Sequence, residues 1–216
     1  MMDILTDALN YLMQNKSDFL QALAVHLQLS LFSLLIGILL CVPLGILCAK
    51  KARLSTSIMG AVNSFRVIPS LAILVIMMPL LGNGFLPALV ALTILSCPPI
   101  VINTFLGISN VSASVKESAT GMGMSDRQRL FRVEIPLALP LIISGIRTAA
   151  VEVISSATLA AFIGGGGLGT FIVNGLGMYD FSIVMVGAVP VALLAIFSEI
   201  TLALVERYLT KFNRVK

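Results

Sequence analysis

The stretch Glu117-Ser-Ala-Thr-Gly-Met-Gly-Met-Ser-Asp-Arg-Gln-Arg-Leu-Phe-Arg-Val-Glu-Ile-Pro136 divides an otherwise strongly apolar chain. With the adjoining lysine, its charged residues are Lys116, Glu117, Asp126, Arg127, Arg129, Arg132 and Glu134. On both sides the chain returns to apolar runs of about 20 residues or more, which is the length that spans a bilayer. We call residues 117–136 the polar segment. It has to lie at a membrane surface, so we expect it to contact something soluble.

The composition places the protein in the membrane class. Of its 216 residues, 58% are hydrophobic and 11% are charged, whereas a soluble domain carries about 25% charged residues. The net charge of +4 reflects membrane topology rather than nucleic-acid binding, because the basic residues are confined to alternate loops. Cys41, Cys48 and Cys97 fall inside apolar runs, so we expect thiols that pack as small hydrophobic groups. With a single histidine, no metal site is expected.

Five apolar stretches are long enough to cross a membrane as helices. They are residues 23–49, 58–81, 85–108, 139–163 and 181–205. Backbone groups in hydrocarbon must form internal hydrogen bonds, and runs of this length do not suit a closed barrel. The sequence therefore predicts an all-α, polytopic membrane helical bundle of five spans. We expect a single transmembrane domain over residues 1–216, with a cytoplasmic loop at about residues 109–138.

The orientation follows from lysine and arginine, which concentrate in cytoplasmic loops. The segment before the first span carries Lys16 alone, and the second and fourth loops carry none. The other basic residues outside the spans are Lys50, Lys51, Arg53, Lys116, Arg127, Arg129, Arg132, Arg207, Lys211, Arg214 and Lys216. Five spans put all eleven of these on one side, against one on the other. We therefore predict an outside N-terminus and a cytoplasmic polar segment and C-terminus.

Within the polar segment, the sequence predicts two short helices. Residues 115–122 form the first, which ends at Gly121 or Gly123 because glycine accepts left-handed backbone angles. Ser125 is a candidate N-cap for the second. We expect Pro136 to end this second helix ahead of the fourth span. Two short helices joined at a glycine would form a knob that fits a groove on a partner.

The polar segment resembles the signature of bacterial ABC-importer permeases, which is Glu-Ala-Ala, three residues, Gly, nine residues and Ile-x-Leu-Pro. Here the matching positions are Glu117, Ser118, Ala119, Gly123, Val133, Ile135 and Pro136. The spacing is intact, and Ser118, Val133 and Ile135 are small or conservative departures. The resemblance implies that these residues form the surface that docks a cytosolic ATPase and transmits its motion to the spans.

The resemblance extends over nearly the whole chain and is closest to permeases for glycine betaine, carnitine and choline. The stretches that carry it are residues 68–74, 137–140, 145–148 and 157–161. Glu152 departs from that group, in which an apolar or small residue is usual. The glycine run at residues 164–169 is similar to that of methionine, phosphonate and taurine permeases as well. The implied fold is that of a methionine-permease-like ABC importer.

The glycine run is a candidate outer gate or hinge. Its members are Gly164, Gly165, Gly166, Gly167 and Gly169. Glycines permit unusual backbone angles and close helix approach, so we expect movement or tight packing where they end the fourth span. Pro69 removes a backbone donor inside the second span and is a second candidate hinge; ordinary packing kinks would explain such prolines equally well.

Four charged residues lie within the predicted spans: Arg66, Arg147, Glu152 and Glu199. Intramembrane charges usually face a bundle interior or water. Arg147 and Glu152 are five residues apart and cannot form an i,i+4 pair. We therefore consider Glu199 as a partner for Arg147 and Arg66 as a partner for Glu152. Alternatively, Arg147 anchors the cytosolic interface, or Glu152 attracts a cationic solute.

The resemblance implies the permease subunit of an ATP-driven importer in the bacterial cytoplasmic membrane, carrying a quaternary-ammonium compatible solute. Alternatives are methionine, phosphonate, sulfonate or ergothioneine import, a secondary transporter, or a membrane enzyme. The chain has no G-x-x-x-x-G-K-[ST] motif, so we expect ATP and Mg²⁺ to bind a partner ATPase dimer. Its other partners would be a second permease subunit, identical or homologous, an extracytoplasmic binding protein and membrane lipid, but no nucleic acid.

Overall fold

The computed structural model describes the backbone of residues 2–209 and, among them, all side chains except those of residues 2, 3, 52 and 54. This part of the chain is helical, with no strand. In chain order the elements are α1 (Met2–Gln14), α2 (Lys16–Lys50), α3 (Ala52–Phe65), α4 (Ser70–Leu81), α5 (Phe85–Ser109), α6 (Ala113–Gly121), α7 (Asp126–Arg129), the π-helical η1 (Leu130–Glu134), α8 (Ile135–Ser156), the 3-10 helix η2 (Ala157–Ile163), α9 (Gly169–Met178) and α10 (Phe181–Leu209).

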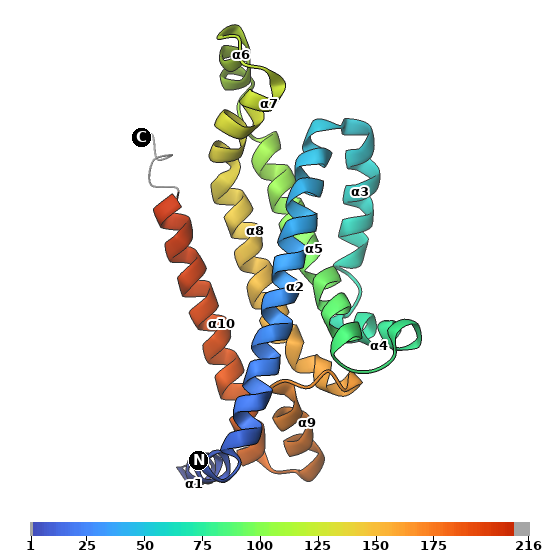
Figure 1. The fold of residues 1–216 in the computed structure, drawn as a ribbon, viewed down its shortest axis with the longest axis vertical. Helices are drawn as coiled ribbons and strands as arrows, with labels where there is room; N and C mark the ends of the chain where they lie inside the picture. The colour runs from blue at the N-terminus through green and yellow to red at the C-terminus, as the bar shows by residue number, and fades with distance from the viewer. Residues whose placement is uncertain (1, 210–216) are drawn as a thin grey trace.

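The long helices run side by side and form the all-α membrane bundle that the sequence predicts (Figure 1). Among the described residues, four continuous helical stretches are long and apolar enough to cross a membrane, and a fifth span results if α3 and α4 are counted together. The four are Lys16–Lys50, Phe85–Ser109, Asp126–Ile163 and Phe181–Leu209. The first begins before residue 23, where the apolar run starts, because a helix continues through polar residues at the membrane surface.

The second predicted span, residues 58–81, is not one straight helix. α3 and α4 are bent by 99° at the break between them. Pro69 occupies that break with an extended ψ of 135°, and a proline disfavours helical geometry in the residue before it. The sequence predicted a hinge or kink at this proline, and the structure adds the size of the bend between α3 and α4.

Pro136 does not end a helix. The chain is helical from Asp126 to Ile163, and Pro136 lies in the first turn of α8, directly after the π-helical η1. Pro136 has no backbone N–H to donate, and the π-helical η1 before it, in which the Ile135 N–H bonds to the Leu130 carbonyl, is the kind of local adjustment that lets a membrane helix continue through a proline. The expectation that Pro136 separates a short helix from the fourth span is therefore corrected, and one rigid rod joins the polar segment to that span.

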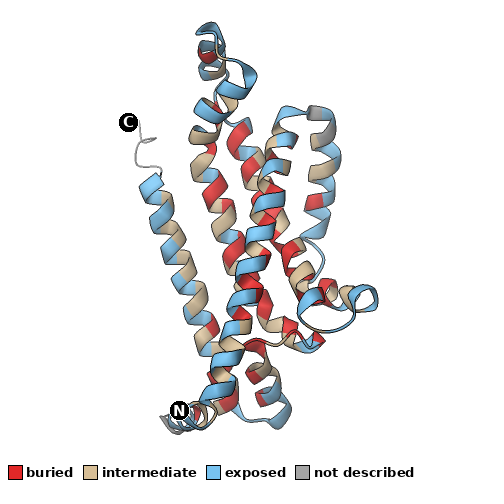
Figure 2. Cartoon of the chain, viewed as in Figure 1, coloured by how far each residue is buried: buried red, intermediate tan, exposed pale blue. Residues whose placement is uncertain are grey.

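The core is built around α5, which packs along both α2 and α8. Figure 2 shows buried residues concentrated on these three helices, whereas α10 is largely uncovered. Glycines let the helices approach closely: a Cβ added to Gly45 of α2 would lie 2.6 Å from Thr104 Cβ, and one added to Gly145 of α8 would lie 2.6 Å from Asn103 Cβ. Small residues at helix contacts are a usual means of close packing in membranes.

The end of the bundle opposite the polar segment is closed by α1, α9 and the start of α10. Phe171 of α9 is buried there, and its ring lies edge-on to Tyr11 with the centroids 6.4 Å apart. The fourth predicted loop, residues 164–180, contains the helix α9.

The three basic segments predicted to share one side lie toward one end of the bundle (Figure 1). These are the junction of α2 and α3, the polar segment, and the end of α10. Lys211, Arg214 and Lys216, which were counted with the last segment, lie outside the described residues.

The close contact of α2 with α5 predicts a position-dependent effect of added methyl groups. Gly45→Ala would place its Cβ 2.9 Å from the carbonyl oxygen of Val101, and overpacking of this kind destabilises by about 1–3 kcal/mol. Gly60→Ala in α3 meets no atom within 4 Å and gains helix propensity. We expect Gly45→Ala to lower the Tm of the detergent-purified protein and Gly60→Ala to leave it unchanged or raised. Equal Tm values for the two variants would contradict this packing.

Candidate functional site

The first part of the polar segment folds as the short helix α6. Its N-cap is Ser112, whose Oγ accepts a hydrogen bond from the Val115 backbone at 3.4 Å. The helix ends at Gly121, and Gly123 follows with φ of +80°. That angle lies in the left-handed region that favours glycine. The two-helix arrangement predicted from the sequence is therefore present, and it turns at the predicted glycine.

The second part begins at Ser125, which caps α7 in a reciprocal arrangement. The Gln128 backbone N–H donates to Ser125 Oγ at 3.3 Å, and the Ser125 backbone N–H donates to Gln128 Oε1 at 2.9 Å. This capping box satisfies two donors that a helix start otherwise leaves without partners. The predicted N-cap is confirmed, and the start of the rod that continues into α8 is fixed in position.

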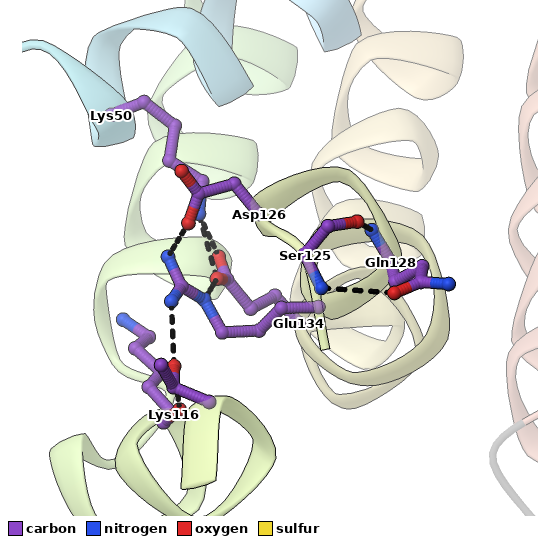
Figure 3. A network of polar contacts seen from close by, with 8 residues as sticks. Lys50, Lys116, Ser125, Asp126, Gln128 and Glu134 are labelled. Atoms are coloured by element: carbon purple, nitrogen blue, oxygen red, sulfur yellow. Dashed lines mark hydrogen bonds and ion pairs between the residues drawn. The ribbon is translucent and has the colours of Figure 1, made fainter. Parts of the chain in front are cut away.

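A buried carboxylate, Glu134, joins the polar segment to the end of α2. Its side chain is 0% exposed, and Lys50 Nζ lies 2.6 Å from each of its two oxygens. Arg129 Nε donates to Oε1 at 3.1 Å. Figure 3 shows these contacts converging between the end of α2 and the rod from α7 to α8. Lys50 and Arg129, which are far from each other in the sequence, thus both compensate the buried charge of Glu134.

Arg129 extends this network to the rest of the polar segment. One guanidinium nitrogen lies 2.9 Å from Asp126 Oδ1, and another donates to Thr120 Oγ1 of α6 at 2.9 Å. Lys116 Nζ, also on α6, donates to the Ile108 carbonyl at the end of α5 at 3.2 Å. We call Lys50, Arg129 and Glu134 the Glu134 network. It ties α2, α6, α7 and η1 together, so the polar segment is held as one body with the spans below it.

The charges of the Glu134 network keep the carboxylate ionised. Burial by itself raises the pKa of Glu134, but the hydrogen bonds from Lys50 and Arg129 and the positive charge of Lys50 outweigh it, so the pKa lies below its ordinary value. Opposite charges and donors favour the charged form in this way. Sequence reasoning missed this network: Lys50 and Glu134 are 84 positions apart, and Lys50 was counted only as a topology signal and Glu134 only as one charge of the polar segment.

The residues that match the permease signature divide into two groups. We call α6, α7 and the turn between them the knob. Glu117, Ser118 and Gly123 are exposed on it, and Ala119 is buried. The three at the base, Val133, Ile135 and Pro136, are half-buried where η1 passes into α8. The first group is available to a soluble partner. The second lies on the continuous helix that leads from the polar segment into the fourth span.

The glycine run forms a tight turn after η2. Gly164, Gly166 and Gly167 have φ between +75° and +84°. A Cβ on Gly166 would lie 3.3 Å from Val25 Cγ1, and one on Gly167 would lie 3.2 Å from His26 Nδ1. The turn is therefore packed against α2. Pro69, the other candidate hinge, lies at the break before α4.

Of the charged residues within the spans, Arg147 forms ion pairs, whereas Arg66 and Glu152 line a cavity without an ion pair between them. Arg147 of α8 reaches α10, where its Nε lies 3.0 Å from Glu199 Oε1 and its NH1 nitrogen lies 2.8 Å from Glu206 Oε2. Glu199 is the partner considered from the sequence, whereas Glu206 was not considered. Arg66 and Glu152 line one cavity, but no ion pair joins them among the described residues.

A bundle of membrane-length helices with a charged two-helix knob at one end defines a multi-pass membrane protein. Residues 41–211 match the model of the family described as binding-protein-dependent transport system inner membrane component. The chain belongs to this family. It is a transport subunit of the inner membrane and not an enzyme.

Relatives in this family match along nearly the whole chain. The glycine betaine/carnitine/choline transport system permease protein OpuCB of Bacillus subtilis (strain 168) is 43% identical over 202 residues, 94% of this chain and 93% of the relative. The choline transport system permease protein OpuBB of the same strain is 44% identical over 200 residues, 93% of this chain and 92% of the relative.

Among solved structures, an inward-facing form of the MetNI methionine ABC transporter matches with a TM-score of 0.84. It is 21% identical, and the match covers 90% of this chain and 97% of that one. At this level of identity the likeness establishes the fold. The predicted methionine-permease-like architecture is confirmed.

The Glu134 network predicts different effects for two carboxylates that contact the same arginine. Glu134→Gln removes a buried charge from Lys50 and Arg129 and should destabilise by about 1–3 kcal/mol. Asp126 is 91% exposed, and an exposed pair contributes about 0–1 kcal/mol, so Asp126→Asn is the matched control. The measurement is hydrogen exchange of the amides in α6 and α7, which should accelerate only in Glu134→Gln. Unchanged exchange in that variant would show that the network does not hold the knob.

Proposed function

We propose that this chain forms the translocation pathway of an ATP-driven importer for compatible solutes with a quaternary ammonium group, such as glycine betaine, carnitine or choline. The observation that carries the proposal is the match of more than nine-tenths of the chain to permeases whose names state those solutes. Import of methionine is the alternative within the family, and the likeness to the methionine transporter supports it only at the level of fold.

In this proposal the knob docks the ATPase. The exposed Glu117, Ser118 and Gly123 contact the partner, and Ala119 packs behind them. Because the helix from Asp126 to Ile163 is continuous, a displacement of the knob moves α8 directly. The Glu134 network carries the same displacement to the end of α2. ATP and Mg²⁺ bind the ATPase, and this chain couples the motion of the ATPase to the translocation pathway.

The other partners follow from the same scheme. The family description names a binding protein, which would deliver solute at the end of the bundle that holds α1 and α9. A second permease copy or homologue, with membrane lipid around it, would cover the uncovered faces of α8 and α10. The N-terminus then lies outside and the polar segment lies in the cytosol, as the positive-inside rule requires. The packed glycine run acts as a gate on the outer side.

The experiment that tests this function is uptake by the whole complex. The chain is co-expressed with its ATPase and binding protein, purified and reconstituted, and uptake of labelled glycine betaine, carnitine, choline and methionine is measured with and without ATP. We expect ATP-dependent uptake of at least one quaternary ammonium solute. Uptake of methionine alone would reject the proposed substrate class, and uptake without the ATPase would reject the importer mechanism.

The coupling role predicts that Gly123→Asp and Glu117→Lys insert normally but uncouple ATP hydrolysis from uptake. Gly123→Asp strains the left-handed turn and adds a charge on the docking face, so uptake should fall about tenfold or more while ATPase activity persists. Gly121→Asp adds the same charge two residues away, where φ is not in the left-handed region. It should therefore retain clearly more uptake than Gly123→Asp. Equal uptake in wild type and Gly123→Asp would count against docking at this turn.

The gate role predicts that a side chain on the glycine turn slows transport without preventing assembly. Gly166→Val forces φ of +75° on a β-branched residue close to Val25, which is unfavourable. Gly177→Val in α9 meets no atom within 4 Å and serves as the control. We expect the initial uptake rate to fall severalfold for Gly166→Val at normal complex yield, and to change little for Gly177→Val. An unaltered rate in Gly166→Val would exclude a gate at this position.

A further inference from the structure

Two charged side chains, Arg66 and Glu152, lie on the wall of one cavity without being paired. The cavity has a volume of about 260 Å³, and the break between α3 and α4, the middle of α5 and the outer half of α8 enclose it. Neither side chain has a hydrogen bond or an ion pair within 4.0 Å among the described residues, although the charge of Arg66 acts on Glu152. Arg147 of the same helix, by contrast, is paired with Glu199.

The cavity lies where membrane transporters hold their solutes. Pro98, one of its lining residues, lies near the middle of α5, so the cavity is near the centre of the bilayer. Arg66 lies directly at the 99° break in the second span. Solute sites near the midplane are typically formed at such discontinuous helices, because the break frees polar backbone groups.

A stripe of polar side chains on α8 leads from this cavity toward the end of the bundle that carries the polar segment. Ser144, Thr148, Glu152 and Ser155 follow one another at helical spacing and none of them is buried by the rest of the chain. A second cavity, of about 560 Å³, lies between α8 and α10 and is lined by Thr148, Ser155 and Glu199. Glu152 lines both cavities.

Polar and charged groups in a span do not face lipid, and they usually line a water-filled cavity or meet another protein surface. The α8 stripe is therefore the side of this subunit that faces the transport route, and Glu152 lies at the junction of its two cavities. An unpaired cation and an unpaired anion on one cavity wall are complementary to a solute that carries both charges.

We propose that this cavity is a solute site for zwitterions, in which Arg66 binds a carboxylate and Glu152 faces a quaternary ammonium group. The assignment rests on the proposed function and narrows its substrate class. A guanidinium binds a carboxylate through two parallel hydrogen bonds. A quaternary ammonium cannot donate a hydrogen bond, so it is held by charge and by aromatic faces, and Phe65 also lines this cavity.

The two charges predict selectivity between solutes of the proposed class. Glycine betaine carries a carboxylate and a quaternary ammonium, and it uses both residues. Choline has the ammonium without the carboxylate, so it uses Glu152 while the positive charge of Arg66 opposes it. Arg66 therefore distinguishes the zwitterion from the cation, and Glu152 serves both.

The test compares glycine betaine and choline uptake by the reconstituted complete importer, with the binding protein saturated so that rates report the permease. Arg66→Gln should lower the ratio of glycine betaine to choline uptake by about tenfold or more, since a hydrogen-bonded charge contributes roughly that factor. Arg66→Lys should restore part of the ratio. Glu152→Gln should lower both rates by a similar factor. Because the ratio is measured within one preparation, it is independent of how much of a variant folds.

Two exposed charges outside the cavity provide matched controls. Arg53→Gln, at the start of α3, and Asp18→Asn, near the start of α2, remove the same charges and should leave the ratio unchanged. An unchanged ratio in Arg66→Gln, or undiminished uptake in Glu152→Gln, would overturn the site while leaving the proposed function intact. A wild-type importer that carries neither solute would overturn the proposed function and the site together.

Discussion

The low polarity of the bilayer is the constraint on which the rest of this structure depends. Hydrocarbon supplies no hydrogen-bond partners, so every backbone group must be satisfied inside the chain, and helices result. Charged side chains then lie in three kinds of place. They lie at the ends of the bundle, in ion pairs such as Arg147 with Glu199, or on faces that a pathway or a second subunit would cover. The locations of the polar groups are therefore the main guide to function.

The Glu134 network gives the knob a mechanical connection to the spans. A charge is expensive to bury unless it is paired and hydrogen-bonded, and Glu134 has both kinds of compensation, from Lys50 and Arg129. Because these partners lie on different helices, a movement of the knob that preserves the contacts also moves the end of α2. The continuous helix from Asp126 to Ile163 adds a second route. The proposed coupling thus depends on geometry that is rigid where the polar segment meets the membrane.

Patterns within short stretches of sequence predicted the features that depend on local interactions. The apolar runs gave the long helices, Ser125 marked a helix start, and Gly123 marked the turn. Features that depend on distant contacts were not predictable: Lys50 and Glu134 carry no shared pattern, and only the folded chain brings them within 2.6 Å. Pro69 indicated a bend, but no local pattern of residues gives its angle of 99°. Likewise, Arg66 and Glu152 were considered as a pair, whereas the structure shows them on one cavity wall without a bond between them.

The proposed mechanism requires that the knob lies in the cytosol, where a separate ATPase binds and moves it. Met122, 71% exposed between α6 and α7, gives the most direct measurement when it is changed to cysteine and labelled with a membrane-impermeant maleimide. The native Cys41 and Cys48 are buried and Cys97 is half-buried, so labelling of the chain without the Met122 substitution gives the background. The account predicts labelling in inverted vesicles, none in right-side-out vesicles, and protection when the ATPase is added. Labelling from the outer side, or equal labelling with and without the ATPase, would contradict it.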